Sequence, residues 1–209
     1  MEVVLEKPKS RISNKIPKHL IYEEMDGVPL YRKGYKDVLS GIKTAEEIMG
    51  SSKLQSFIIS FIIKYLNRFL PNQYEAVSSE SGLHLAIGNN LATDIAIYNI
   101  HEVGNIFEPV YFNTPPKIVF EIDVKIDLTK SKTTESEYIT RKTKKLLKFG
   151  VEKVIWILTA SQTIIIAEAN QTDWKMFDFS GEIDVMNDIS FSIKQLVEER
   201  GLSLPSVEV

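Results

Sequence analysis

Acidic residues in two stretches of the sequence are the ones best suited to chemistry. Asp94 opens a short apolar stretch, and Glu121, Asp123 and Lys125 alternate with apolar residues between positions 118 and 128. Carboxylate oxygens are the ligands that Mg²⁺ prefers, and a bound Mg²⁺ or Mn²⁺ ion activates water and neutralises charge at a phosphorus atom. The sequence therefore predicts a metal site at Asp94, Glu121 and Asp123, served by a nearby lysine and suited to phosphodiester hydrolysis.

The 118–128 stretch is predicted to be one long strand that positions these groups. Side chains alternate between the two faces of a strand, so Ile118, Phe120 and Ile122 face one way while Glu121 and Asp123 face the other. A strand with one wet face shows the same alternation. The unbroken apolar run at 154–158 indicates, however, that the sheet is covered on both faces, where buried charges need partners.

The remaining pattern predicts the elements of an α/β fold. A helix capped by Ser51 or Ser52 should run to Phe69, with Phe57 and Phe61 in the core, and Pro71 should end it. A second helix should span 135–149 and stop at Gly150. Together with the flanking strands it forms a strand-helix-strand unit with a right-handed crossover. Further elements are expected as a hairpin within 22–40, short strands at 74–77, 83–87, 94–98 and 163–167, and a helix over about 189–200.

Composition limits the class of protein. The 209 residues suffice for one core, so we expect one domain over 21–209, preceded by a mobile basic arm at 1–20. The absence of cysteine excludes disulfides and thiolate sites, and the three scattered histidines do not suggest a zinc site. No secretory signal or membrane span is evident, which predicts a cytoplasmic protein.

Any binding of nucleic acid must be local, because the net charge is −3. Basic residues gather in two segments, which are as well explained by solvated faces as by a surface that follows phosphates. The first segment holds Lys7, Lys9, Arg11, Lys15 and Lys18, and the second holds Lys130, Lys132, Arg141, Lys142, Lys144, Lys145 and Lys148.

Several short motifs between about residues 20 and 170 resemble the Uma-two family of the PD-(D/E)XK superfamily. They are Thr93-Asp94-Ile95-Ala96-Ile97, Val119-Phe120-Glu121-Ile122, and the segment from Lys142 to Gly150-Val151-Glu152-Lys153-Val154-Ile155-Trp156. The resemblance implies a restriction-endonuclease-like mixed sheet flanked by helices. It also implies a metal-dependent endonuclease acting on DNA, usually as a homodimer.

The sequence departs from the family pattern at several positions. Thr93 replaces the usual proline, and the usual histidine at the start of the first long helix is absent from the Ser51–Gln55 region. The early acidic residue of the family could match Glu23 or Asp37.

Two lysines can serve the predicted site. The resemblance favours Lys142. The Asp123-Val124-Lys125 motif, and the position of Lys125 on the predicted strand, favour Lys125. We predict that Lys125 is catalytic and that Lys142 supports it. A noncatalytic nucleic-acid-binding or regulatory module on the same fold is the alternative reading, because fold alone does not determine function.

Overall fold

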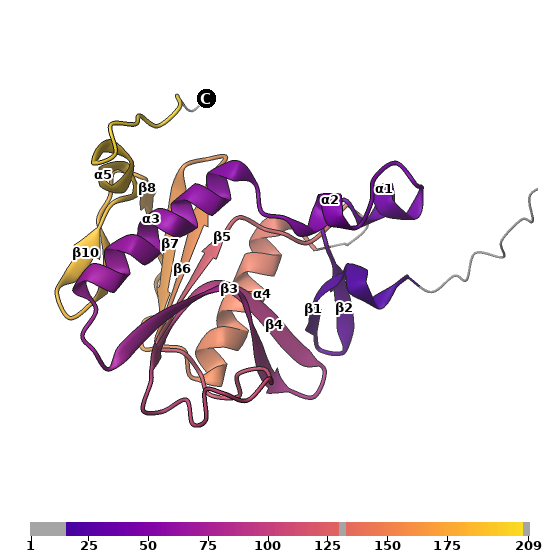
Figure 1. Ribbon diagram of the computed structural model, residues 1–209, viewed down its shortest axis with the longest axis horizontal. Coiled ribbons are helices and arrows are strands. Elements are labelled where there is room, and N and C mark those ends of the chain that lie inside the picture. The colour runs from indigo at the N-terminus through magenta and orange to yellow at the C-terminus, as the bar shows by residue number, and fades with distance from the viewer. Residues whose placement is uncertain (1–15, 130–132, 207–209) are drawn as a thin grey trace, which may run out of the picture.

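A computed structural model describes residues 16–129 and 133–206. The first half contains a 3-10 helix, a hairpin and three α-helices before two long strands (Figure 1). Their bounds are η1 Lys18–Leu20, β1 Ile21–Met25, β2 Val28–Tyr31, α1 Tyr35–Leu39, α2 Glu46–Met49, α3 Lys53–Phe69, β3 Tyr74–Ala86 and β4 Asn89–Asn99. The second half comprises β5 Ile118–Ile122, α4 Glu135–Phe149, β6 Lys153–Leu158, β7 Thr163–Glu168, β8 Lys175–Asp178, β9 Ile183–Met186, β10 Ile189–Phe191 and α5 Ile193–Glu198.

Eight strands form one mixed sheet. Seven follow the order β2-β1-β4-β5-β6-β7-β8, and β3 pairs with β4 outside this path. Strands β5 and β6 are parallel and joined through α4, whereas the other pairs of this sheet are antiparallel. The predicted mixed sheet with a strand-helix-strand crossover is confirmed. The predicted short strands at 74–77, 83–87 and 94–98 prove to be parts of the long β3–β4 hairpin.

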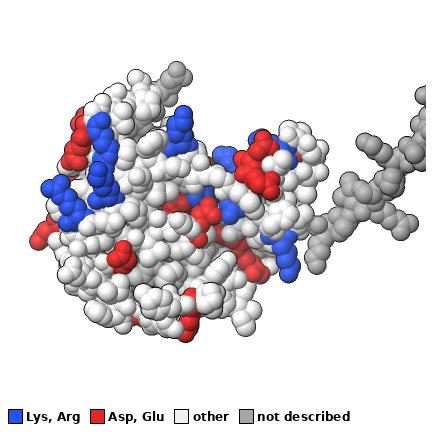
Figure 2. Space-filling view, in the orientation of Figure 1, with Lys and Arg blue, Asp and Glu red and all other residues white. Residues whose placement is uncertain are grey.

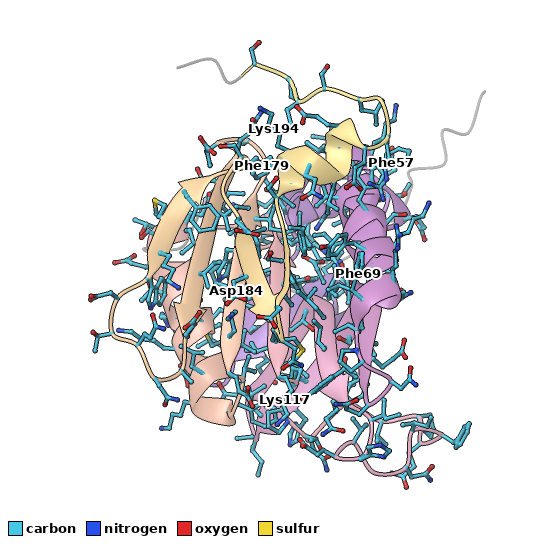
Figure 3. All side chains as sticks on the ribbon, turned by 90° about the vertical axis from the view of Figure 1, so that its left-hand side faces the viewer. Phe57, Phe69, Lys117, Phe179, Asp184 and Lys194 are labelled. Atoms are coloured by element: carbon cyan, nitrogen blue, oxygen red, sulfur yellow. The ribbon has the colours of Figure 1, made fainter. Side chains whose placement is uncertain are left out.

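Helices cover both faces of the sheet. The side of α3 that carries Ile58, Ile62 and Leu66 packs with residues of α5 on one face, and α4 packs on the other (Figures 1 and 3). Ser52 caps α3 by accepting a 3.2 Å hydrogen bond from the Gln55 backbone N–H. The prediction that Phe57 is a core residue is wrong, since 55% of it is exposed.

The crossover helix α4 begins and ends as predicted. Thr134 and Glu137 form a capping box, which satisfies backbone N–H groups of the first turn. Gly150 ends the helix with φ of 121°, and a Cβ there would lie 2.9 Å from the Pro115 ring. Both the backbone angle and the close approach therefore require glycine. The capped helix holds Lys142 on its buried side.

Two sequence-based boundaries are wrong. Strand β5 ends at Ile122 and does not continue to Leu128, because Asp123 adopts a left-handed φ of 60° that takes the chain out of the strand. The segment predicted as a helix over 189–200 divides into strand β10 and the shorter helix α5, which Ser192 caps. Strands β8 and β9, of four residues each, were not predicted.

The predicted basic arm lies mostly outside the described residues, with Lys7, Lys9, Arg11 and Lys15 before residue 16. At its end, Lys18–Leu20 form η1 and Leu20 is fully buried. The described fold thus begins a few residues before the predicted boundary at 20/21. Within 16–129 and 133–206, no helix is long and apolar enough to cross a membrane.

Candidate active site

The candidate site lies where two strands separate along one edge of β4. Asn90 pairs with β3 and β1, and Ile95 pairs with β3 and β5, so β1 and β5 share the edge opposite β3. Between β1 and β5, the backbone of Ala92 forms its hydrogen bonds on this edge with side chains and not with a neighbouring strand. Its N–H donates to Glu23 Oε1 at 3.2 Å, and its carbonyl accepts from Lys142 Nζ at 2.7 Å. Side chains of the site therefore close this fork in the sheet.

Four residues in the fork form a sealed cluster: Glu23, Glu121, Tyr138 and Lys142. The Lys142 ammonium lies 2.5 Å from Glu23 Oε1 and 2.9 Å from Glu121 Oε2. The Tyr138 hydroxyl donates to Glu23 Oε2 at 2.8 Å. All four side chains are buried, so two carboxylates share one ammonium away from solvent.

Burial and charge act in opposite directions within the sealed cluster. Burial of the Glu121 carboxylate raises its pKa, and Lys142 offsets this effect only in part. Burial alone would lower the pKa of Lys142, but the carboxylates of Glu121 and Glu23 outweigh it and raise that pKa. Lys142 is consequently held in its charged form.

A second group, the open cluster, consists of Arg32, Glu80, Asp94 and Lys125. The Lys125 ammonium contacts Asp94 Oδ1 and lies 3.2 Å from Glu80 Oε1, while Arg32 Nη2 lies 3.0 Å from Glu80 Oε2. Burial raises the pKa of Asp94, although Lys125 opposes it. Burial would also raise the pKa of Glu80, but Arg32 and Lys125 lower it overall. The Lys125 side chain is 14% exposed, so this cluster reaches the surface.

Asp94 and Glu121 occupy the same face of the sheet. The antiparallel register that pairs Ile95 with Phe120 places Asp94 opposite Glu121 where β5 ends. Side chains opposite one another in such a pair have Cβ atoms about 4.5–5.5 Å apart. The register therefore places Asp94 and Glu121 next to each other on one face.

Helix α3 supplies a residue that sequence reasoning did not find. Gln55 Nε2 donates to the Ile122 carbonyl at 2.8 Å and lies 3.5 Å from Asp94 Oδ2, which also accepts from the Ile122 N–H at 2.7 Å. Gln55 lies in the region where the Uma-two resemblance places a histidine. Only its location, on the first turn of a capped helix, could have indicated this contact.

Asp123, predicted as a metal ligand, lies outside both clusters. Its Oδ1 accepts from the Thr159 N–H and its Oδ2 from the Thr159 hydroxyl, both at 2.7 Å. The left-handed backbone at Asp123 turns the side chain toward the end of β6. Lys125 reaches Asp94 from the loop after β5, and not from the strand face that the alternation predicted.

Irregularities in two strands deliver further residues of the site. The β1–β2 register slips between Ile21 and Glu23, and such bulges re-aim side chains near active sites. The β3–β4 register slips between Ser78 and Ser81, where Glu80 has a positive φ of 54°. Alternation cannot reveal bulges, which explains why Glu80 was missed, and with it Tyr22, whose ring centre lies 5.8 Å from Lys125 Nζ.

The bulge in β1 also settles which early acidic residue reaches the site. Glu23 does so, whereas Asp37 forms a surface ion pair with Lys43 at 3.0 Å. Of the two candidates that the sequence left open, Glu23 therefore lies in the fork and Asp37 lies on the surface.

A basic pocket of about 310 Å³ opens beside the open cluster. In the orientation of Figure 1, basic and acidic side chains meet near the middle of the molecular face (Figure 2). The cations lining the basic pocket are Arg32, Lys33, Lys43 and Lys125, which outnumber by one its carboxylates, Glu47, Glu80 and Asp123.

The basic segment predicted on the second helix lies partly on the surface of α4. Arg141 and Lys145 form ion pairs with Asp26, and Lys144 and Lys148 are exposed. Lys130 and Lys132 lie outside the described residues.

The donor set fits a hard divalent cation bound by few protein ligands. Among the described residues no group of three or more His, Cys, Asp or Glu could hold a metal ion. Mg²⁺ is often bound through one or two carboxylates, with water and substrate phosphate completing its shell. Asp94 and Glu121 provide such a pair, and Glu121 Oε1 is buried with no hydrogen-bond partner among the described residues.

Comparison with solved structures supports the fold. The chain matches a crystal structure of a DUF820 protein from Anabaena variabilis ATCC 29413, provisionally described as a nuclease, with a TM-score of 0.61. The match covers 83% of this chain and 88% of the other at 17% sequence identity. No family profile and no curated protein matches the sequence. DUF820 is the Uma-two family, so the predicted resemblance and the restriction-endonuclease-like fold are confirmed at the level of structure.

Proposed function

We propose that this protein is a Mg²⁺- or Mn²⁺-dependent endonuclease that hydrolyses phosphodiester bonds of DNA. The observation that carries the proposal is the Asp94–Glu121 pair, set opposite each other on adjacent strands with an ammonium on each side. The provisional description of the structural neighbour as a nuclease agrees with it.

In this proposal Asp94 and Glu121 hold the metal ion, which when bound supplies an activated water and positive charge at the phosphate. Gln55 fixes the Ile122 backbone beside them. Lys142 keeps Glu121 in place and offsets its charge. Lys125, on the exposed side, donates to a phosphate oxygen or to the attacking water. Asp123, with both oxygens bound to Thr159, takes no part.

The basic pocket is the proposed path of the nucleic-acid backbone. Lys125, one of its cations, contacts Asp94, so a nucleic-acid strand bound in this pocket would lie beside the Asp94–Glu121 pair. Phosphate contacts of this kind weaken steeply with salt. We further propose a cytoplasmic homodimer with a single domain, which includes η1 as well as residues 21–209.

A noncatalytic binding module is the second candidate, and two observations favour it. Lys125 contacts the Asp94 oxygen that a metal ion would need, and the third position of the D/E-x-K motif, counted from Glu121, is Asp123 and not lysine. A protein that has lost turnover could retain both features.

Cleavage of single-stranded, duplex and supercoiled DNA with Mg²⁺ or Mn²⁺, and with EDTA as a control, separates the two candidates. The nuclease proposal expects metal-dependent cleavage in the wild type and none in Asp94→Asn. This variant should lose little stability, because Asn keeps the shape of the side chain and removes a buried charge. Calorimetric titration with Mg²⁺ supplies the second readout. Absence of both metal binding and cleavage in the wild type leaves only the binding module.

A further inference from the structure

A second pocket begins on the other side of the Arg32–Glu80 ion pair. It has a volume of about 470 Å³ and shares Arg32 and Glu80 with the basic pocket. Glu23 and Ala92, which both contact Lys142, also line it. The side pocket, as we call it, therefore adjoins the fork that holds the carboxylates.

The side pocket differs from the basic pocket in its chemistry. Two of its acidic residues are already paired: Glu23 with Lys142, and Glu80 with Arg32 and Lys125. The remaining charged residues of the lining, Lys18 and Glu24, have opposite charges. Tyrosine side chains supply aromatic surface in the side pocket. A nearly neutral, aromatic pocket suits a nucleobase better than a phosphate.

Tyr111 forms a fixed aromatic wall of the side pocket. A Cβ on Gly82 would lie 2.8 Å from its ring, so the ring rests directly on the backbone of β3. The neighbouring Phe112 is tied to β3 by hydrogen bonds of 3.0 Å to the Gly82 carbonyl and 2.8 Å from the His84 N–H. Tyr111 nevertheless remains 60% exposed on this rigid support. Such a ring can stack on a base without being ordered first.

Two polar atoms of residues that line the side pocket have no hydrogen-bond partner among the described residues. They are the Tyr22 hydroxyl and Arg32 Nε, and both atoms are buried. The Arg32 guanidinium lies 4.8 Å from the centre of the Tyr22 ring. Buried donors without acceptors are rare in folded proteins.

We infer that the side pocket binds the nucleoside next to the scissile phosphate, with its base stacked on Tyr111. This inference rests on the proposed function, and it narrows the substrate from DNA in general to nucleic acid with an unpaired base. A base inside an intact duplex cannot enter a side pocket, so the substrate is a single strand or a strand with a base turned out of the helix.

Binding of short oligonucleotides tests the inference without cleavage. The probes are DNA and RNA strands carrying 2-aminopurine, each alone and in a blunt duplex, measured with EDTA and again with Ca²⁺, which takes the same oxygen ligands as Mg²⁺. The wild type binds the single strand more tightly than the duplex, with a change in 2-aminopurine fluorescence. Tyr111→Ala weakens single-strand binding by roughly 5- to 150-fold, the equivalent of losing one stacked base, and Tyr111→Phe does not.

Phe107→Ala is the matched control, because Phe107 is an aromatic residue of the same loop, 89% exposed, and does not line the side pocket. It should bind like the wild type. Equal affinity for duplex and single strand, or wild-type affinity in Tyr111→Ala, overturns the side-pocket inference and leaves the nuclease proposal standing. Absence of any nucleic-acid binding by the wild type overturns both. Tighter binding of the RNA strand supports the side pocket and contradicts DNA as the substrate.

Discussion

The sealed and open clusters are built alike and differ in their access to solvent. In each, one lysine bridges two carboxylates, Glu23 and Glu121 for Lys142, and Asp94 and Glu80 for Lys125. Lys142 is enclosed on all sides, whereas Lys125 faces the basic pocket. Enclosure makes the first lysine part of the fold, and access leaves the second free to meet a substrate. In the proposed mechanism, access to solvent is therefore the reason to assign the supporting role to Lys142 and the acting role to Lys125.

The largest expected effect is the loss of stability in Lys142→Met. Without the ammonium, Glu23 and Glu121 remain buried and unpaired, which should lower the free energy of unfolding by about 3–5 kcal/mol. Urea unfolding measures the change. Lys144→Met, an exposed position on the same helix, is the control and should stay within about 0.5 kcal/mol of the wild type. Wild-type stability in Lys142→Met would remove the basis for treating the sealed cluster as structural.

Lys125→Met should affect activity more than stability. We expect metal-dependent single-turnover cleavage to fall about 10²–10³-fold, since a charged donor near the phosphate is lost. Stability should fall by only about 1–2 kcal/mol, because Asp94 keeps its bond from the Ile122 N–H. The comparison with Lys142→Met is made at a temperature where circular dichroism shows both variants folded. Full activity in Lys125→Met together with loss in folded Lys142→Met would assign catalysis to Lys142.

The pH dependence of stability should differ between Glu121→Gln and the wild type. Burial raises the folded-state pKa of Glu121, so the native state binds a proton that the unfolded state has released. The contribution of this group to stability is therefore greatest below the unfolded pKa near 4.5 and is lost as pH rises toward the folded pKa. Its slope is at most about 1.4 kcal/mol per pH unit.

Denaturant unfolding from pH 4 upward should show that the free energy of unfolding of Glu121→Gln increases relative to that of the wild type as pH rises. The stability of Asp94→Asn should also increase relative to the wild type as pH rises, since burial raises the pKa of Asp94 as well. Parallel stability curves for the wild type and Glu121→Gln would show that the pKa of Glu121 is the same in both states.

The smallest expected effect concerns metal affinity in the open cluster. The Lys125 ammonium contacts the same Asp94 carboxylate that a cation would use, so the two compete. Lys125→Met should bind Mg²⁺ about fivefold more tightly, a gain of ~1 kcal/mol, in a calorimetric titration. Glu80→Gln should weaken Mg²⁺ binding, because it removes the other acceptor to which Lys125 can move. Weaker binding in Lys125→Met would show that the lysine helps to hold the metal ion.

Local patterns predicted the parts of the molecule that depend on local rules. The caps and apolar spacing of α3 and α4 gave both helices, and alternation placed Glu121 on the face of β5 opposite Phe120 and Ile122. Alternation failed at Asp123, where one left-handed residue ends the strand. The positions of Lys142 and Glu23 depend on how α4 and β1 dock against β4, which is decided by contacts between distant segments. Tyr22 and Glu80 were missed because they lie at register shifts, which the alternation of residue types does not reveal.

The fork in the sheet also links the site to synthesis of the chain on the ribosome. Glu23 and Lys142 are separated by 119 positions, and the lysine emerges after all three carboxylates that surround the fork. A nascent chain that stops before α4 would bring Glu23 and Glu121 together with no cation between them, and their repulsion keeps the strands apart. The proposed hydrolytic site consequently forms only once α4 is made, and no fragment ending before this helix should cut nucleic acid.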